Sequence, residues 1–163
     1  MSETDQKQEK NLKKYADGVE QLEAALAGLS EADLDRSREE GKWTTRQIVH
    51  HIVDAEDLWE TVIKAALGNP GCTFDISWYI PDNKCAEPLD YATRPIADAV
   101  ELFKAVRRHV VQMITHLPGA WDRNIVIRRD VDIPEGKEFT IGAIIGFQVI
   151  HLARHLQQIR EAR

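Results

Sequence analysis

Apolar residues recur every three or four positions in four long stretches of the chain, which is the spacing of one face of an α-helix. The four stretches are residues 7–28, 44–67, 95–116 and 140–163. In the first stretch the apolar positions are Leu12, Tyr15, Val19, Leu22 and Leu26. The pattern predicts four long amphipathic helices, with frayed polar residues at 1–8 and one short turn of helix that starts at Ser30.

Residues that start or stop helices stand at the ends of these stretches. Thr44 can cap the second helix, and the run 68–71, Gly-Asn-Pro-Gly, ends it. Pro95 suits the first turn of the third helix, and Pro118-Gly119 follows its last turn. The expected fold is therefore an all-α four-helix bundle, and the length of 163 residues suits a single domain, 1–163.

Two connections are too long or too patterned to be simple loops. The segment 72–94 carries several large apolar and proline residues, namely Phe74, Trp78, Tyr79, Ile80, Pro81 and Pro88. We interpret it as a crossover between the second and third helices that covers one end of the bundle, either as a functional wall or as a packed plug. Residues 124–128 are rich in β-branched side chains and 134–137 resemble a turn, which predicts a small irregular hairpin before the last helix.

Composition narrows the class of protein. Apolar residues make up 43% of the chain and charged residues 29%, as in ordinary globular proteins. The net charge of −6 argues against a nucleic-acid partner, and no apolar run is long enough for a membrane span. No secretory signal is evident, and the two cysteines, Cys72 and Cys85, match no zinc-binding spacing. We therefore expect a cytoplasmic protein with reduced thiols.

Three of the six histidines are predicted to face the interior of the bundle. His151 and His155 lie one turn apart on the buried face of the last helix, and His51 lies at the edge of the apolar face of the second. His50 falls on the polar side of the same helix, whereas His109 and His116 fall opposite the apolar stripe of the third. Buried imidazoles need a partner, which can be a metal ion or an ordinary hydrogen bond within the core.

A three-histidine set with an open fourth position is typical of a catalytic zinc site, although imidazole also suits nickel, iron and copper. Asp54 follows His51 by three residues and Gln158 follows His155 by three, so either side chain could orient a ligand ring. Asp54 fits equally well as a solvated helix carboxylate. The H-E-x-x-H pattern of zinc proteases, the E-x-x-H pairs of di-iron bundles and the G-x-S-x-G of serine hydrolases are absent from the sequence.

Two segments carry a resemblance to a known family. Residues 41–59, GKWTTRQIVHHIVDAEDLW, and residues 151–159, HLARHLQQI, resemble the second and last helices of the DinB/YfiT-like superfamily, especially its bacillithiol-transferase branch. The resemblance covers essentially the whole chain. It implies an up-down-down-up four-helix bundle, a divalent metal (zinc or nickel foremost) held by His51, His151 and His155, and frequent homodimers.

The resemblance also frames the function. Members of the superfamily are described as metal-dependent hydrolases, while characterised relatives use bacillithiol, mycothiol or glutathione. The leading hypothesis is that a metal-activated low-molecular-weight thiol attacks a small electrophilic substrate. The alternatives are hydrolysis by metal-bound hydroxide and a non-catalytic bundle stapled by the metal.

Further expectations concern the surroundings of the metal. Arg46 and Arg154, one on each ligand-bearing helix, are candidates to hold a carboxylate of the thiol, although both could instead be exposed helix charges. Phe74, Trp78 and Tyr79 are candidates for an apolar wall. Apolar residues in 121–139, outside the helical stripes, fit a homodimer interface as well as a packed loop.

Overall fold

The computed structural model describes residues 2–79, 84–130 and 132–163. Its long helices are α1 (Glu3–Leu26), α3 (Thr45–Gly68), α4 (Ala97–His116) and α5 (Ile141–Glu161), and α2 (Glu31–Leu34) is one short turn. The strands are β1 (Thr73–Asp75), β2 (Asn124–Arg128) and β3 (Lys137–Thr140), with a 3-10 turn, η2 (Ala120–Asp122), before β2. No helix in the described parts of the chain is long and apolar enough to cross a bilayer.

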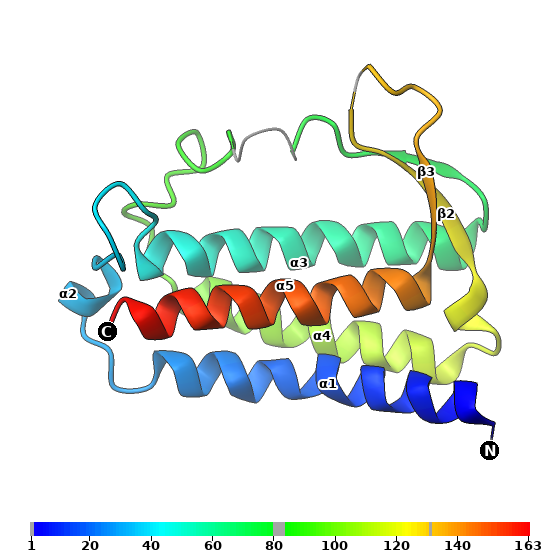
Figure 1. The fold of residues 1–163 in the computed structure, drawn as a ribbon, viewed down its shortest axis with the longest axis horizontal. Helices are drawn as coiled ribbons and strands as arrows, with labels where there is room; N and C mark the ends of the chain where they lie inside the picture. The colour runs from blue at the N-terminus through cyan, green and yellow to red at the C-terminus, as the bar shows by residue number, and fades with distance from the viewer. Residues whose placement is uncertain (1, 80–83, 131) are drawn as a thin grey trace.

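The four long helices lie side by side in an up-down-down-up arrangement (Figure 1). Around the bundle, α1 contacts α5 and α4, while α3 contacts α4 and α5. Helices α1 and α5 run in one direction and α3 and α4 in the other, which requires the chain to return along the bundle between α3 and α4. The predicted four-helix bundle is confirmed.

Side-chain caps define where the helices begin. Ser30 and Thr44 each accept a hydrogen bond from the backbone of the third helical residue, and the third residue's side chain bonds back to the cap. Thr140 caps α5 in the simpler way, without the return bond. Ser2 forms the same reciprocal box with Asp5, so α1 starts at Glu3 and the predicted fraying of residues 1–8 is wrong for residues 3–8.

The connections form a small sheet against one end of the bundle. Strands β2 and β3 are the predicted hairpin, paired in antiparallel register with Ile125 opposite Phe139. Strand β1 comes from the crossover and pairs parallel with β2, with Thr73 opposite Val126. This strand was not predicted, because it is three residues long and its partner lies about fifty residues further along the chain. The sheet fixes where the crossover leaves α3.

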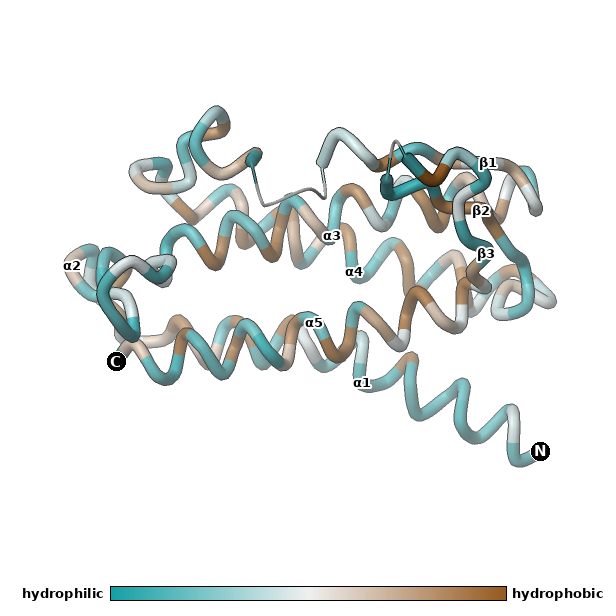
Figure 2. Tube along the Cα trace, turned by 45° about the horizontal axis from the view of Figure 1, so that its top comes forward, coloured by the Kyte–Doolittle hydropathy of each residue, from teal (hydrophilic) through white to brown (hydrophobic). Residues whose placement is uncertain are grey.

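The core runs along the inner faces of the helices and under the sheet. Figure 2 shows hydrophilic first turns in α1, whereas α3 and α5 carry hydrophobic residues along much of their length. Ile125 and Ile127 of β2 are fully buried in this core. A buried ion pair also crosses it: Arg107 Nη2 of α4 lies 2.9 Å from Glu56 Oε2 of α3. These contacts hold α3 in place against its neighbours.

Candidate metal centre

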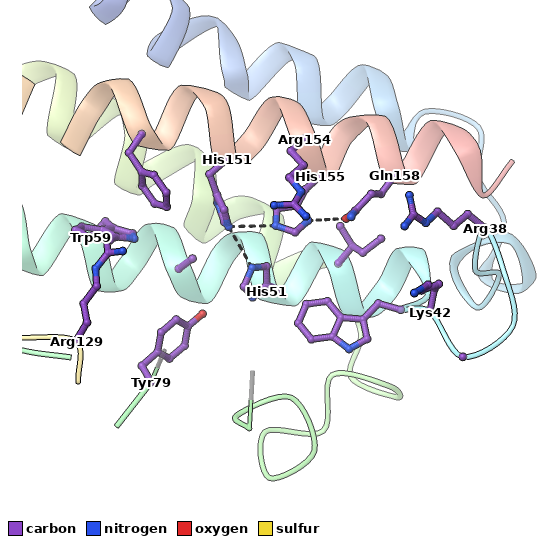
Figure 3. Close-up of a pocket in the computed structure, with 15 residues that line it drawn as sticks. Arg38, Lys42, His51, Trp59, Tyr79, Arg129, His151, Arg154, His155 and Gln158 are labelled. Carbon is purple, nitrogen blue, oxygen red and sulfur yellow. Dashed lines mark hydrogen bonds between the residues drawn. The ribbon is translucent and has the colours of Figure 1, made fainter. Parts of the chain in front are cut away.

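Three histidine rings meet where α3 passes α5. The Nε2 atom of His151 lies 3.2 Å from Nε2 of His51 and 3.1 Å from Nε2 of His155. The ligating atoms of all three lie within 4.8 Å of one another. His151 and His155 are brought together by the helical spacing of four residues, and His51 by the antiparallel crossing of α3 and α5 (Figure 3). The structure therefore brings together the three histidines named from the sequence.

The separations of these nitrogens suit a metal ion. Histidine nitrogens sit about 2.0–2.1 Å from zinc, so two of them in a tetrahedral site are roughly 3.3 Å apart. The two shorter separations in the cluster, 3.1 and 3.2 Å, are close to that value. Three nitrogen donors on one side leave the opposite side free for another ligand. The donor set thus fits a divalent metal with an open coordination position.

Gln158 orients one of the rings. Its Oε1 accepts a hydrogen bond of 2.8 Å from Nδ1–H of His155. With the proton held on Nδ1, the lone pair of His155 is on Nε2 and points into the cluster. A histidine that binds a metal through one ring nitrogen usually donates a hydrogen bond from the other nitrogen, which fixes the orientation of the ring.

The surroundings keep the rings neutral. Burial and, to a smaller extent, the neighbouring His155 together lower the pKa of His51 to about 4. Burial likewise lowers the pKa of His151 to about 3, with added effects of His155 and His51. The pKa of His155 is also lowered, mainly by burial. A neutral imidazole is the form that binds a metal, so all three are ready to coordinate at neutral pH.

The histidines line a cavity of about 540 Å³ between α3, α5 and the connections. Aromatic rings form part of its wall: Trp43 lies 5.0 Å from the ring of His51, and Phe147 stacks on His151 at 5.6 Å. The charged residues that line the cavity are all basic, namely Arg38, Lys42, Arg129 and Arg154. No aspartate or glutamate is among the described residues that line it. The cavity therefore combines apolar walls with positive charge.

The structure does not bring Asp54 to the histidines. Asp54 lines a separate cavity of about 480 Å³ together with Asp57, Phe74 and Trp78. Its carboxylate lies near Tyr91, whose pKa is raised chiefly by burial and further by Asp54. The offset of three residues from His51 turns Asp54 toward the crossover rather than toward α5.

The two arginines proposed as a carboxylate clamp have different positions. Arg46 is only 5% exposed and is bound by Asp35 at 2.8 Å and Glu31 at 2.7 Å, so it anchors the segment around α2 and does not line the cavity. It stands in the first turn of α3, beside α2, and that proximity explains the error. Arg154 does line the cavity that contains the histidines.

His50 is not a surface residue, contrary to the prediction. It is 0% exposed, stacks on Tyr91 at 5.8 Å and makes a hydrogen bond of 3.0 Å with the carbonyl oxygen of Arg94. The crossover covers this side of α3, and a single-helix projection cannot show that cover. His109 and His116 are exposed, as predicted.

The predicted apolar wall is only partly correct. Tyr79 lines the metal-site cavity, whereas Phe74 and Trp78 line the separate cavity beside Asp54. Trp78 is 66% exposed. Ile80 and Pro81, which were named with the crossover, lie outside the described residues.

Sequence reasoning missed several residues of the cavity, most notably Arg129. A signal for it was present: in β2 the buried residues are Ile125 and Ile127, and a period of two places residue 129 on the same inward side. Lys42 and Arg38 lie in the irregular segment before α3, where no periodic pattern exists to place them.

The chain is similar to a known family and to several known proteins. A family model described as the DinB superfamily matches residues 15–159. Relatives from Halalkalibacterium halodurans (24% identity over 86% of this chain and 77% of the relative) and Oceanobacillus iheyensis (27% over 85% and 75%) are both named "putative metal-dependent hydrolase". A third relative of that name, from Bacillus mycoides, is 26% identical over 95% of this chain and 84% of its own length.

A solved structure shares the fold. YfiT from Bacillus subtilis, described as "a probable metal-dependent hydrolase with an unusual four-helix bundle topology", superposes with a TM-score of 0.82. The match covers 99% of this chain and 87% of that chain, at 20% sequence identity. At this identity the likeness concerns the fold.

Proposed function

The chain belongs to the DinB superfamily, and on this premise we propose that it is an enzyme that depends on a divalent metal held by His51, His151 and His155. One observation carries the proposal: three neutral imidazoles converge on the wall of a cavity of about 540 Å³, with the nitrogen of His151 at 3.2 and 3.1 Å from those of His51 and His155, close to the spacing of two ligands on one metal. A metal that only stapled two helices would not need an adjoining cavity of this size. Zinc and nickel are the metals that we expect first.

Each residue of the centre has a distinct task. His51, His151 and His155 would hold the metal through Nε2, and Gln158 keeps the proton of His155 on the opposite ring nitrogen. When bound, a divalent metal supplies a Lewis acid that lowers the pKa of a coordinated thiol or water. Trp43 and Phe147 pack against His51 and His151 and give the cluster apolar neighbours.

We propose transfer of a low-molecular-weight thiol to an electrophile as the reaction. The sulfur forms a bond to carbon, the bond from that carbon to the leaving group breaks, and the thiol proton goes to solvent. The lining of the cavity supports this choice, because hydrolysis of an amide needs a group that protonates the leaving nitrogen, and no carboxylic acid is among the described lining residues. The basic lining also suits thiols that carry carboxylates.

Hydrolysis is the second candidate, because the curated relatives carry that name. The two reactions share the metal and differ in the nucleophile. A thiol-consumption assay with bacillithiol, glutathione or cysteine and a chloro-aromatic electrophile separates them. We expect a faster rate with the metal-loaded protein than with the metal-free protein, and loss of that difference in His155→Ala. Ester or amide hydrolysis without any metal-dependent thiol consumption would establish the second candidate.

Metal analysis tests the centre itself. We expect one divalent ion per chain in the purified protein and a sharp fall in His51→Ala. His50→Ala is the matched control, because His50 is buried next to His51 but bonds to the carbonyl of Arg94 instead of joining the cluster. Equal metal loss in both variants, or retention in both, would contradict the assignment.

A further inference from the structure

Arg129 enters the metal-site cavity from the hairpin. It directly follows β2, whose inward residues Ile125 and Ile127 are buried in the core, and it continues their side of the strand. Figure 3 shows Arg129 beside Trp59 at one end of the cavity, with Arg38 and Lys42 at the other end and the histidines between them. Arg129 is thus the basic residue that approaches the centre from the side of the sheet.

Aromatic rings hold the guanidinium of Arg129 in place. Its Cζ lies 5.5 Å from the ring centre of Trp59, 5.5 Å from Phe139 and 5.7 Å from Phe147. Rings at these distances attract a cation and restrict its motion, but they leave the edge of a guanidinium free to donate hydrogen bonds. The rings therefore hold the guanidinium of Arg129 in place while its N–H groups stay available to a ligand.

The guanidinium lacks the partner that a half-buried cation normally has. Within the described residues no carboxylate pairs with Arg129, and its buried Nε atom has no hydrogen-bond acceptor. Burial lowers its pKa, which reflects the cost of removing the charge from water. Arg38, by contrast, is already paired with Glu161 at 3.1 Å. An anion placed against Arg129 would offset the cost of its burial.

The charge of the cavity points the same way. The whole chain has 27 acidic and 21 basic residues, yet the four described charged residues that line the cavity are all basic. Such a local excess of one sign in a cleft attracts ligands of the opposite sign.

We propose that the cavity binds an organic carboxylate whose acidic group lies against the edge of the Arg129 guanidinium. Its apolar part would lie along Trp59 and Phe147, and this places the remainder of the molecule next to the three histidines. The planar guanidinium matches a carboxylate through two parallel N–H···O bonds. The identification of this ligand as a reactant rests on the proposed function, whereas its binding to Arg129 does not.

Direct binding tests the proposal without an activity assay. The probe is 3-phenylpropanoate, with the neutral 3-phenylpropanamide for comparison, titrated calorimetrically into the zinc-loaded protein at low salt. We expect the acid to bind and the amide to bind at least tenfold more weakly. Arg129→Gln should lower the affinity for the acid at least tenfold. Arg129→Lys should lower it less, because lysine keeps the charge but loses the paired N–H groups.

Arg128→Gln is the matched control. Arg128 is the preceding residue, and its side chain bonds to the carbonyl oxygen of Pro134 and faces Asp75 at 3.6 Å, outside the cavity. We expect less than a twofold change in affinity for the acid. An equal loss in Arg128→Gln and Arg129→Gln would indicate a general charge or folding effect and would overturn the proposal, as would unchanged affinity in Arg129→Gln.

Metal removal separates this inference from the proposed function. Repeating the titration after chelation shows whether the acid binds the protein or the metal: we expect the dependence on Arg129 to remain. If the protein binds no metal but the acid still requires Arg129, the proposed function fails and the anion site stands. If metal content and thiol consumption are as proposed but the affinity for the acid is the same in the wild type and in Arg129→Gln, only the anion site fails.

Discussion

Single residues decide the chemistry of the histidine cluster. Helical phase was sufficient to select His51, His151 and His155 from six histidines, because each lies on a long and regular helix. The same reasoning failed for His50 and Arg46. The crossover contacts His50 and α2 contacts Arg46, and neither contact can be seen from the helix that carries the residue. The role of Gln158 was open in the sequence, and a hydrogen bond of 2.8 Å now gives it one.

The bond from Gln158 leads to a prediction about metal affinity. Gln158→Leu removes the acceptor that fixes the proton of His155, so we expect the affinity for zinc to fall by about 10–100-fold although all three ligands remain. A competition titration with a zinc-binding dye measures the change. Gln157→Leu serves as the control, because Gln157 is exposed and bonds to Glu161 instead of to one of the three histidines. An affinity equal to that of the wild type in Gln158→Leu would show that the bond does not orient the ring.

The lowered pKa values predict how the metal-free protein responds to acid. A histidine in the unfolded chain has a pKa of about 6.5. Folding lowers the pKa to about 4 for His51 and about 3 for His151. Between these values the unfolded state binds protons that the folded state does not, so the free energy of unfolding falls as the pH is lowered from about 6.5 toward 4. Each such histidine contributes at most about 1.4 kcal/mol per pH unit.

Urea unfolding of the chelated protein at pH 7.5 and pH 5.0 measures this dependence. We expect a clear loss of stability at pH 5.0 and a smaller loss in the double variant His51→Gln, His151→Gln, which lacks two of the groups. The same pH dependence in the wild type and the double variant would show that these histidines are not the cause.

At the scale of elements, close approach of α1 to α4 depends on Gly18. The buried Arg107 of α4 donates a hydrogen bond of 2.6 Å to the backbone carbonyl of Tyr15 in α1, and it stacks 4.2 Å from the Tyr15 ring. The Tyr15 hydroxyl donates a hydrogen bond to Glu56 of α3. A Cβ atom on Gly18 would lie 2.0 Å from Nη1 of Arg107 and 2.6 Å from a methyl group of Leu152. Helices α4 and α5 therefore approach α1 at a position that has no room for a side chain.

Gly18→Ala is expected to destabilise the fold. In a free helix, replacing glycine with alanine stabilises by about 0.5–1 kcal/mol. At position 18 the added methyl group must displace Arg107 from its buried bonds, which we expect to cost about 1–3 kcal/mol overall. Gly146→Ala in α5 is the opposite case, because a Cβ there meets nothing within 4 Å, and it should stabilise slightly. Chemical unfolding of both variants checks the sign of each effect.

Element boundaries were predictable where capping residues mark them, as at Ser30, Thr44 and Thr140. Contacts between elements were not. Strand β1 exists because residues 73–75 pair with β2, which follows α4 in the chain, and no local sequence pattern indicates such a pairing. The period of two in β2 places Arg129 on the inward side of the strand, but which cavity it reaches depends on the packing of the hairpin against the bundle. The three clustered histidines could be named from helical phase, while the charged wall around them required the assembled fold.

At the scale of the whole molecule, the hairpin bears on the predicted homodimer. The apolar residues of 121–139 that suggested an interface include Ile125 and Ile127, which are buried within the chain itself. That argument for a dimer is therefore weaker, although the dimer stays a prediction. Light scattering at micromolar concentration tests it, since a single species at the chain mass of 18.6 kDa would contradict it.

The first and last helices are parallel neighbours, so the two termini lie at opposite ends of the bundle (Figure 1). A tension applied between the termini therefore pulls α1 and α5 past each other lengthwise, and the contacts of the buried part of α1, from Tyr15 to Ala25, must yield together rather than one after another. Handles at residues 2 and 117 would instead grip α1 and its antiparallel neighbour α4 at one end and peel them apart. We expect optical tweezers to record a higher rupture force for the first geometry. A bundle built from four helices that simply alternate in direction would have its termini at the same end and would lack this resistance to stretching.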